Sequence, residues 1–330
     1  MCRCRPPRCQ SLREAPEMSR SEQVFHAGEL ILQNRAGVAP SYRERVAHAI
    51  RPQMPQQHRD FFESLPVLFL GLLDARGRVW ATPAVGEVGF LRSRDPGHLA
   101  VGARPVLGET LWLDVRAGAK VGAVGMEMAS RRRNRMNGTI TAVNGEGFEI
   151  AVDLSFGNCP QYIQTRDLVW PANPPAPEAV ALPDWESQSR ALVAQADTFF
   201  IASRAAEMSA RPIDGVDASH RGGRPGFLTI NDDSSLSFPD FAGNRFFNTL
   251  GNIEADGRVG LFIPDFKSGA GIFVTGLATV DWRPDRVSHF KGAERIVDVQ
   301  PEEIWYCTHA LPGPAPLVST WPLLAETGVW

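Results

Sequence analysis

The 330-residue sequence contains no apolar run of about 18 residues, the length that a membrane-spanning helix requires. It also has no large excess of either charge, because 34 Lys and Arg oppose 37 Asp and Glu, for a formal net charge of −3. Bulk binding to nucleic acid is therefore not expected. Its five cysteines are too few for a disulfide framework in a chain of this length, and they predict a reducing, cytoplasmic compartment.

Several motifs that mark common chemistries are also missing. The sequence has no Walker-type phosphate loop and no G-x-G-x-x-G after a first strand, which argues against P-loop and Rossmann proteins. It has no H-E-x-x-H, C-x-x-C or G-x-S-x-G pattern, so neither a metal site nor a hydrolase nucleophile is predicted.

The first 17 residues differ in composition from the rest of the chain. They place Cys2, Cys4 and Cys9 among arginines and prolines, without the apolar centre of a secretory signal. A C-x-C…C spacing could supply metal ligands, but no His or further Cys nearby completes a set of four. Residues 1–17 are therefore predicted to form a disordered tail.

The remaining chain reads as short strands separated by Gly, Pro and Asp, with few helices. Helical patterns occupy residues 26–64, where Ser41 and Glu44 have the spacing of a capping box, and the stretch after Trp185. Residues 169–185 hold five prolines and predict a linker. The prediction is a first domain over residues 18–168 and a second over residues 186–330.

The two halves repeat each other at a nearly constant offset of 137 or 138 residues. GFL recurs at 89 and 226, a strand pattern recurs at 98 and 236, AKVGAV at 119 matches GRVGLF at 257, and NGTITAV at 137 matches TGLATVD at 275. Such a repeat indicates duplication of one β-rich domain. The predicted fold class is mainly β, with two tandem barrels and flanking helices.

The two copies differ in one conspicuous way, because the polar and basic chemistry lies in the second. Where the first copy reads TPAVGE, the second reads SHRGGR, and the residues singled out there are Ser219, His220, Arg221, Gly222 and Arg224. Glycine permits a ligand to approach the backbone closely. His220 has three interpretations: an acid–base catalyst, a hydrogen-bond donor to a ligand, or an ordinary turn histidine.

The stretch 238–253 of the second copy predicts an anion site. Asp240 ends a strand, Gly243 permits a tight turn, and Asn244, Arg245 and Asn248 follow at the start of an expected helix. A helix N-terminus with arginine and amide side chains binds anions readily. The plainer alternative is a solvated turn whose arginines form surface ion pairs.

Two further stretches of the first copy carry alternatives. Asn158 is predicted to cap a helix with Cys159 in its first turn, either as an ordinary helix start or with a thiol activated by the helix dipole. The basic run of Arg131, Arg132, Arg133 and Arg135 is either a solvated strand edge or a set of side chains that reaches the anion site of the second copy.

Three segments taken together, FGNCPQYIQTR, SHRGGRPGFL and SFPDFAGNRFFNTLGNI, give a resemblance to a known family. The chain resembles the pyridoxamine 5′-phosphate oxidase-related, FMN-binding split-barrel proteins, in a two-domain form, over roughly residues 50–290. The resemblance implies two six-stranded antiparallel Greek-key barrels. It also implies a homodimer, and FMN held where two barrels meet.

In that family a strand arginine and a following turn hold the FMN phosphate. By position the turn falls on Gly243, Asn244 and Arg245, with Asn244 where the family has arginine, and the strand arginine is Arg221 or Arg224. Ser219 and His220 are expected near the flavin. The first copy lacks the turn residues, so one site per chain is expected.

The resemblance implies an FMN-dependent oxidoreductase with an unidentified small-molecule substrate and NAD(P)H as a possible electron donor. The full signature for binding pyridoxamine phosphate is missing, which argues against that substrate. The alternative is a module that binds or stores flavin, haem or deazaflavin without turnover, and a third interpretation is a structural protein.

Overall fold

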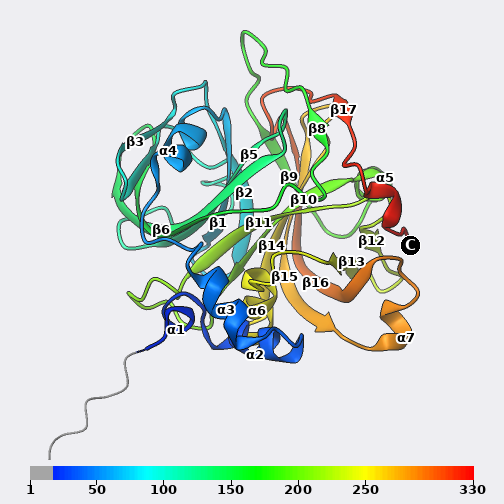
Figure 1. The fold of residues 1–330 in the computed structure, drawn as a ribbon. Coiled ribbons are helices and arrows are strands. Elements are labelled where there is room, and N and C mark those ends of the chain that lie inside the picture. The colour runs from blue at the N-terminus through cyan, green and yellow to red at the C-terminus, as the bar shows by residue number, and fades with distance from the viewer. Residues whose placement is uncertain (1–17) are drawn as a thin grey trace, which may run out of the picture.

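The computed structural model describes residues 18–330 and is mainly β, as the sequence predicts (Figure 1). Two large antiparallel sheets each curve around an apolar core, one formed by each half of the chain. The predictions for residues 1–17 lie outside the described residues. None of the helices in residues 18–330 is both long and apolar enough to cross a membrane.

The first sheet joins seven strands in the order β2-β1-β5-β6-β7-β4-β3. Their bounds are β1 Val67–Leu73, β2 Val79–Val85, β3 Leu91–Asp95, β4 His98–Val101, β5 Lys120–Glu127, β6 Arg132–Val143 and β7 Phe148–Gly157. β1 and β2 are almost wholly buried, which accounts for their apolar sequences.

The second sheet repeats this order strand for strand, as β11-β10-β14-β15-β16-β13-β12, with β9 added beside β16. Its strands are β9 Glu178–Leu182, β10 Thr198–Arg204, β11 Val216–Gly222, β12 Thr229–Ile230, β13 Leu236–Phe241, β14 Arg258–Pro264, β15 Gly271–Asp281 and β16 Ala293–Thr308. The sequence repeat is therefore a repeat of topology. Six strands per barrel were expected, and seven follow the common path in each sheet.

Two elements differ from the sequence-based predictions. β9 lies inside the proline-rich stretch 169–185, so this stretch is part of the second sheet as well as a connection. Ser41 does not cap a helix, because helix α3 begins at Pro40, and the Glu44 carboxylate accepts hydrogen bonds from the backbone of Arg20 and Ser21 instead.

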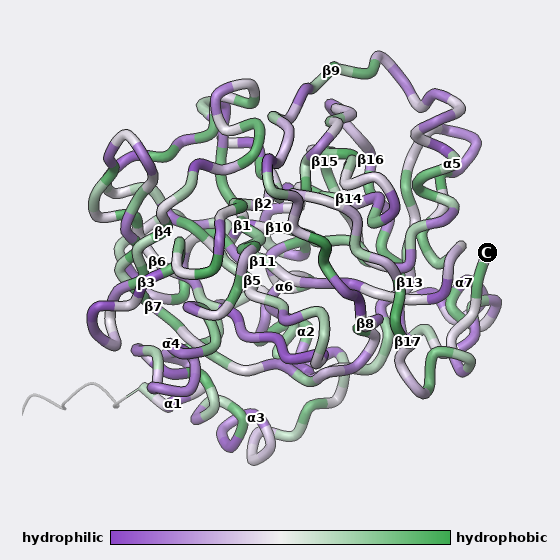
Figure 2. The backbone as a smooth tube through the Cα atoms, turned by 90° about the horizontal axis from the view of Figure 1, so that it is seen from above, coloured by the Kyte–Doolittle hydropathy of each residue, from purple (hydrophilic) through white to green (hydrophobic). Residues whose placement is uncertain are grey.

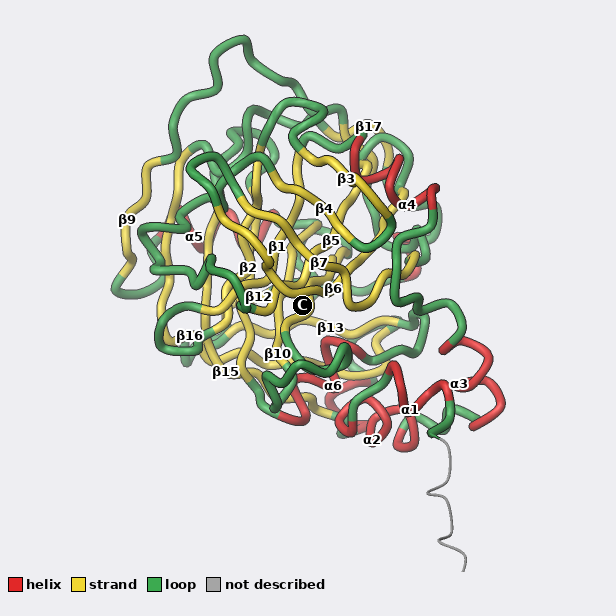
Figure 3. Tube along the Cα trace, turned by 90° about the vertical axis from the view of Figure 1, so that its left-hand side faces the viewer, coloured by secondary structure: helices red, strands yellow, loops and turns green. Residues whose placement is uncertain are grey.

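The helices gather mainly at one side of the strands (Figure 3). They are α1 Arg20–Val24, α2 Ala27–Arg35, α3 Pro40–Ala47, α4 Gln56–Glu63, α5 Ser187–Gln195, α6 Asn248–Ala255 and α7 Pro284–Val287, with a short 3-10 turn Leu324–Glu326. A third, small sheet pairs β8 Thr165–Arg166 with β17 Leu317–Ser319. Helix α2 packs closely on α6, where a Cβ added to Gly28 would lie 2.2 Å from the carbonyl oxygen of Gly251.

The two barrels pack against each other around an approximate twofold relation. Phe69 of β1 and its counterpart Phe200 of β10 stack with ring centroids 3.4 Å apart. Close backbone contacts repeat in the same way: Gly122 approaches the backbone of Asp217, and its counterpart Gly260 approaches that of Trp80. Strands β1, β2 and β10 lie together at the centre of the molecule (Figure 2). The seam between the barrels is thus an internal version of a symmetric dimer contact.

Histidine 58 on α4 makes the fold sensitive to acid. Its ring is buried and lies 2.8 Å, from Nδ1, from the hydroxyl of Ser155. Burial, together with the charges of Arg51 and Arg132, lowers its pKa from 6.5 to about 4. Between these values the unfolded chain binds a proton that the folded chain does not, so stability falls as the pH falls.

We therefore expect the substitution His58→Gln to reduce the loss of stability between pH 7 and pH 4 by about 1–2 kcal/mol. The value is modest because the exposed charges of Arg51 and Arg132 are screened by solvent. Urea unfolding of both proteins across this range is the measurement. Parallel pH profiles for the two proteins would contradict the prediction.

Candidate functional site

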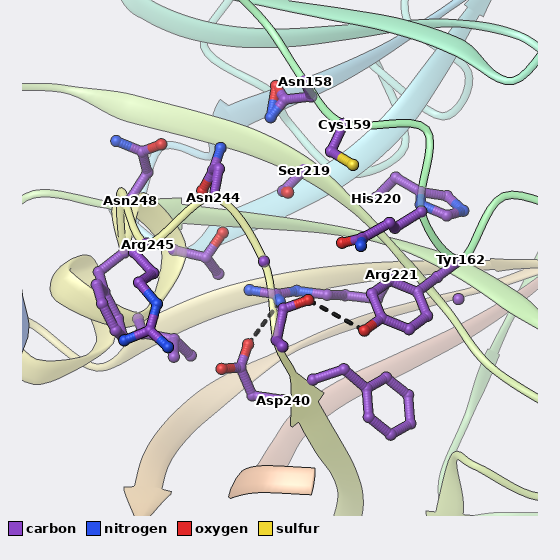
Figure 4. Close-up of a pocket in the computed structure, with 18 of the residues that line it drawn as sticks. Asn158, Cys159, Tyr162, Ser219, His220, Arg221, Asp240, Asn244, Arg245 and Asn248 are labelled. Atoms are coloured by element: carbon purple, nitrogen blue, oxygen red, sulfur yellow. Dashed lines mark hydrogen bonds and ion pairs between the residues drawn. The ribbon is translucent and has the colours of Figure 1, made fainter. Parts of the chain in front are cut away.

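A pocket lies at the seam of the two barrels and takes its walls from both. The second barrel contributes β11, β13, the turn after β13 and the start of α6, and the first contributes β6 and the segment after β7 (Figure 4). Nine of the ten residues predicted from the sequence line it. They are Ser219, His220, Arg221, Gly222, Asp240, Gly243, Asn244, Arg245 and Asn248.

Arg224 is the predicted residue that lies elsewhere. Strand β11 ends at Gly222, so the alternation of side chains is lost before position 224. The Arg224 guanidinium donates to the carbonyl oxygen of Thr327, at 3.4 Å, in the C-terminal segment. Of the two candidates for the strand arginine, Arg221 is the one at the pocket.

The basic run of the first barrel divides between the two interpretations given above. Arg133 and Arg135 lie on the same face of β6, because side chains alternate along a strand, and both line the pocket. Arg132 packs over the ring of Phe61, and Arg131 donates to the carbonyl oxygen of Ile163. Half of the run therefore reaches across to the second barrel.

Guanidinium groups outnumber carboxylates at the pocket. The positive groups are those of Arg133, Arg135, Arg221, Arg245 and Arg295, and the negative groups are those of Asp217, Asp240 and Glu294. Two positive charges are thus unmatched by the acids around them. Such an excess favours an anionic ligand.

The carboxylates neutralise some of these arginines more closely than others. Asp217 forms a buried ion pair with Arg135, and Asp240 accepts from Arg221 at 2.7 Å and from Arg295 at 2.8 Å. Arg245 is 45% exposed and lies 3.8 Å from Glu294, beyond ordinary hydrogen-bond range.

Arg133 has no carboxylate within ion-pair distance among residues 18–330. It donates instead to the carbonyl oxygen of Cys159 at 3.0 Å and to the ring of His220. Burial and the neighbouring charges of Arg135 and Arg221 lower its pKa to about 9, which leaves it charged at neutral pH. A buried, repelled and unpaired cation is a favourable partner for an anion.

His220 is buried, with 4% of its surface exposed, and faces Arg133 across the seam. Arg133 Nη1 lies 2.9 Å from His220 Nδ1, while Nε2 has no hydrogen-bond partner among the described residues. Burial lowers the pKa of His220 well below its usual value, and the charges of Arg133 and Arg221 act in the same direction. The imidazole is therefore neutral at physiological pH.

The turn before α6 adopts an uncommon backbone. Arg245 and Phe247 have φ values of 58° and 65°, in the left-handed region, and α6 begins only at Asn248. Asn244 and Arg245 therefore precede the helix instead of starting it. The Asn248 side chain accepts from Arg135 at 3.3 Å and donates to Glu29 of α2, so it links the pocket wall to the N-terminal helices.

Tyr162 is a pocket residue that was not predicted. Its hydroxyl donates to the carbonyl oxygen of Ala242 at 3.0 Å, and its ring stacks on Phe241 (Figure 4). It thereby joins a segment of the first barrel to the turn of the second. Burial raises its pKa to about 12. The predicted helix from Asn158 does not form, because residues 158–164 take an irregular path and Tyr162 has a φ of 64°.

The equivalent region on the other side of the twofold relation is filled with apolar side chains. By strand register, Arg135 pairs with Val124 and Phe273 pairs with Phe262, so Phe273 occupies the place of Arg135. Phe273 packs in one cluster with Leu107, Leu111, Phe266 and Leu311. This arrangement agrees with the expectation of one site per chain.

The chain was compared with known proteins. No family model and no curated protein matches it. Among solved structures it is similar to a putative pyridoxamine 5′-phosphate oxidase from Lactobacillus delbrueckii, at 17% identity and a TM-score of 0.29, covering 38% of this chain and 97% of that one. HupZ of Group A Streptococcus gives 14% and 0.28, covering 36% and 91%, and general stress protein 26 of Bacillus anthracis gives 12% and 0.25, covering 40% and 97%. The family named from the sequence is thus represented among these neighbours.

Proposed function

We propose that this protein binds FMN in the seam pocket and acts as an FMN-dependent oxidoreductase. The observation that carries the proposal is Arg133, a buried cation without a carboxylate partner, in a pocket with two unmatched positive charges. A phosphate monoester carries about −1.5 to −2 charges at neutral pH, which matches this excess. Both barrels supply the charge, so one chain completes the site.

The donor set of the pocket also fits FMN. Several buried polar atoms lack partners in the described residues, namely Nε of Arg133, Arg135 and Arg221, and Nε2 of His220. Unpaired buried donors are costly unless a ligand supplies acceptors. FMN offers phosphate oxygens, ribityl hydroxyls and the carbonyl groups of its ring.

The size of the pocket sets a condition on binding. Its cavity volume is about 110 Å³, below the range of about 300–1,000 Å³ for small-molecule sites. A ligand of FMN size therefore requires the walls to move apart, or its ring to lie in the mouth. Tyr162, held to Ala242 by one hydrogen bond, and the exposed side chain of Arg245 are the groups expected to move.

The bound flavin would supply the redox chemistry. The residues of this chain would do the rest: Arg133 and Arg245 would neutralise the phosphate, and His220 would donate a hydrogen bond. The two barrels would exclude water from the inner wall. NAD(P)H is the proposed electron donor, and a second chain is not needed to complete the pocket.

Arg245 provides the test of phosphate binding. We expect Arg245→Ala to weaken FMN binding by about 1.5–3 kcal/mol, roughly 10- to 150-fold, because a hydrogen bond to a charged group is lost. Titration of the purified protein with FMN, followed by quenching of flavin fluorescence, measures the affinity. Arg224→Ala is the matched control, since that arginine faces Thr327 instead of the pocket, and it should bind FMN as the wild type does.

The wild-type protein decides the wider proposal. A colourless protein that takes up no added FMN would show that the pocket serves another ligand. If FMN binds, anaerobic mixing with NADH or NADPH separates an enzyme from a carrier. Bleaching of the flavin absorbance supports the oxidoreductase, whereas a flavin that neither nucleotide reduces supports the module without turnover.

A further inference from the structure

The contact between Arg133 and His220 fixes the position of a proton. Arg133 projects from β6 of the first barrel and His220 from β11 of the second, and Nη1 lies 2.9 Å from Nδ1. A guanidinium group has five N–H donors and no acceptor. The Nδ1 atom of His220 must therefore accept this hydrogen bond with its lone pair.

A neutral imidazole that accepts at Nδ1 carries its single proton on Nε2. The charged groups that face the ring, Arg133 and Arg221, are both positive, and they oppose addition of a second proton. Nε2 has no partner among residues 18–330, and the residue lines the pocket. The other face of the ring packs edge-on against Phe200, whose ring offers no acceptor oxygen or nitrogen.

We propose that Arg133 is a positioning residue that holds His220 as a permanent hydrogen-bond donor to an acceptor atom of the pocket ligand. The identity of that ligand as FMN rests on the proposed function, but the position of the proton does not. The matching chemical class is a carbonyl oxygen or an imine nitrogen, of which the oxidised isoalloxazine ring carries several. A ligand that presented an N–H or O–H group there would leave two donors facing each other.

This inference changes the role predicted for His220. A general base needs a free lone pair, and the only lone pair of the neutral ring is already engaged by Arg133. Acid–base catalysis by His220 is therefore replaced by electrostatic stabilisation. A fixed donor favours whichever form of the ligand carries more negative charge on its acceptor atoms. For a flavin this is the reduced form, so loss of the donor should lower the midpoint potential.

The first experiment uses the full chain without added FMN. Protein labelled with ¹⁵N-histidine is examined by NMR, which separates the two neutral tautomers and the charged form by their nitrogen shifts. We expect His220 to carry its proton on Nε2. Arg133→Met should allow a mixture of tautomers, and the control Arg132→Met, which alters an exposed neighbour in the same basic run, should not. A proton on Nδ1, or on both nitrogens, in the wild type would overturn the proposal.

The second experiment tests the ligand contact. We expect His220→Leu to weaken FMN binding about five- to tenfold, the effect of about 1 kcal/mol for a neutral hydrogen bond, and to lower the midpoint potential of the bound flavin. His220→Gln retains an N–H donor and should recover both properties in part. Wild-type affinity and potential in His220→Leu would refute the contact. A wild-type protein without FMN affinity would refute the proposed function instead, and the tautomer would then be judged by NMR alone.

Discussion

Replacing Asp217 by asparagine is expected to lower the free energy of unfolding by about 3–5 kcal/mol. Asp217 on β11 pairs with Arg135 on β6 across the seam, and their side chains are only 3% and 5% exposed. Removing one member of a buried ion pair leaves the other charge without compensation, which costs more than the pair itself contributes. Thr249 of α6 also loses a charged acceptor for its hydroxyl group.

Chemical denaturation of the wild type and the variant measures this loss. Asp232→Asn is the matched control, because Asp232 is exposed in the turn between β12 and β13 and should change stability by less than about 0.5 kcal/mol. Equal stability of the two variants would mean that the seam tolerates an unpaired guanidinium, which would remove the argument for a water-excluding contact.

Replacing Gly260 by alanine is expected to cost about 3 kcal/mol and to disturb the packing of the two barrels. A Cβ at this position of β14 would lie 2.5 Å from Cα of Trp80 and 2.7 Å from the amide nitrogen of Ala81. These atoms belong to the backbone of β2, which cannot move aside as a flexible side chain can. Overpacking of this kind typically costs 1–3 kcal/mol, and rigid neighbours place it at the upper end.

The control for this substitution is Gly145→Ala in the turn between β6 and β7, where an added Cβ meets no atom within 4 Å. It should leave stability close to that of the wild type. Thermal unfolding monitored by circular dichroism compares the two variants. If Gly260→Ala melts with the control, the close approach of β14 to β2 does not hold the barrels together.

The fold was predictable because it is written in local and repeated patterns. The offset of 137 or 138 residues, seen in GFL, AKVGAV and their counterparts, corresponds to two sheets with the same strand order. The prediction missed β9 because its five residues lie among prolines. It assigned a helix after Asn158 because one capping residue outweighed a segment whose path depends on distant partners.

The candidate site was predictable in composition but not in pairing. Comparison of the two copies identified nine pocket residues, since the chemistry that one copy lacks stands out in the other. It could not choose between Arg221 and Arg224, because the end of β11 falls between them. Nor could it find Tyr162 or the contact of Arg133 with His220, which depend on packing between segments far apart in the chain.

The filling of the second seam site by Phe273 has a consequence for how such a protein can change. In a dimer of identical chains every substitution appears twice, so a phenylalanine at this strand position would close both pockets together. Joining the two halves in one chain separates their fates: one pocket can be sealed with apolar side chains while the other keeps its arginines. The sealed side then serves as a hinge-free brace for the open one. A saturating ligand should accordingly bind with a stoichiometry of one per chain and without cooperativity.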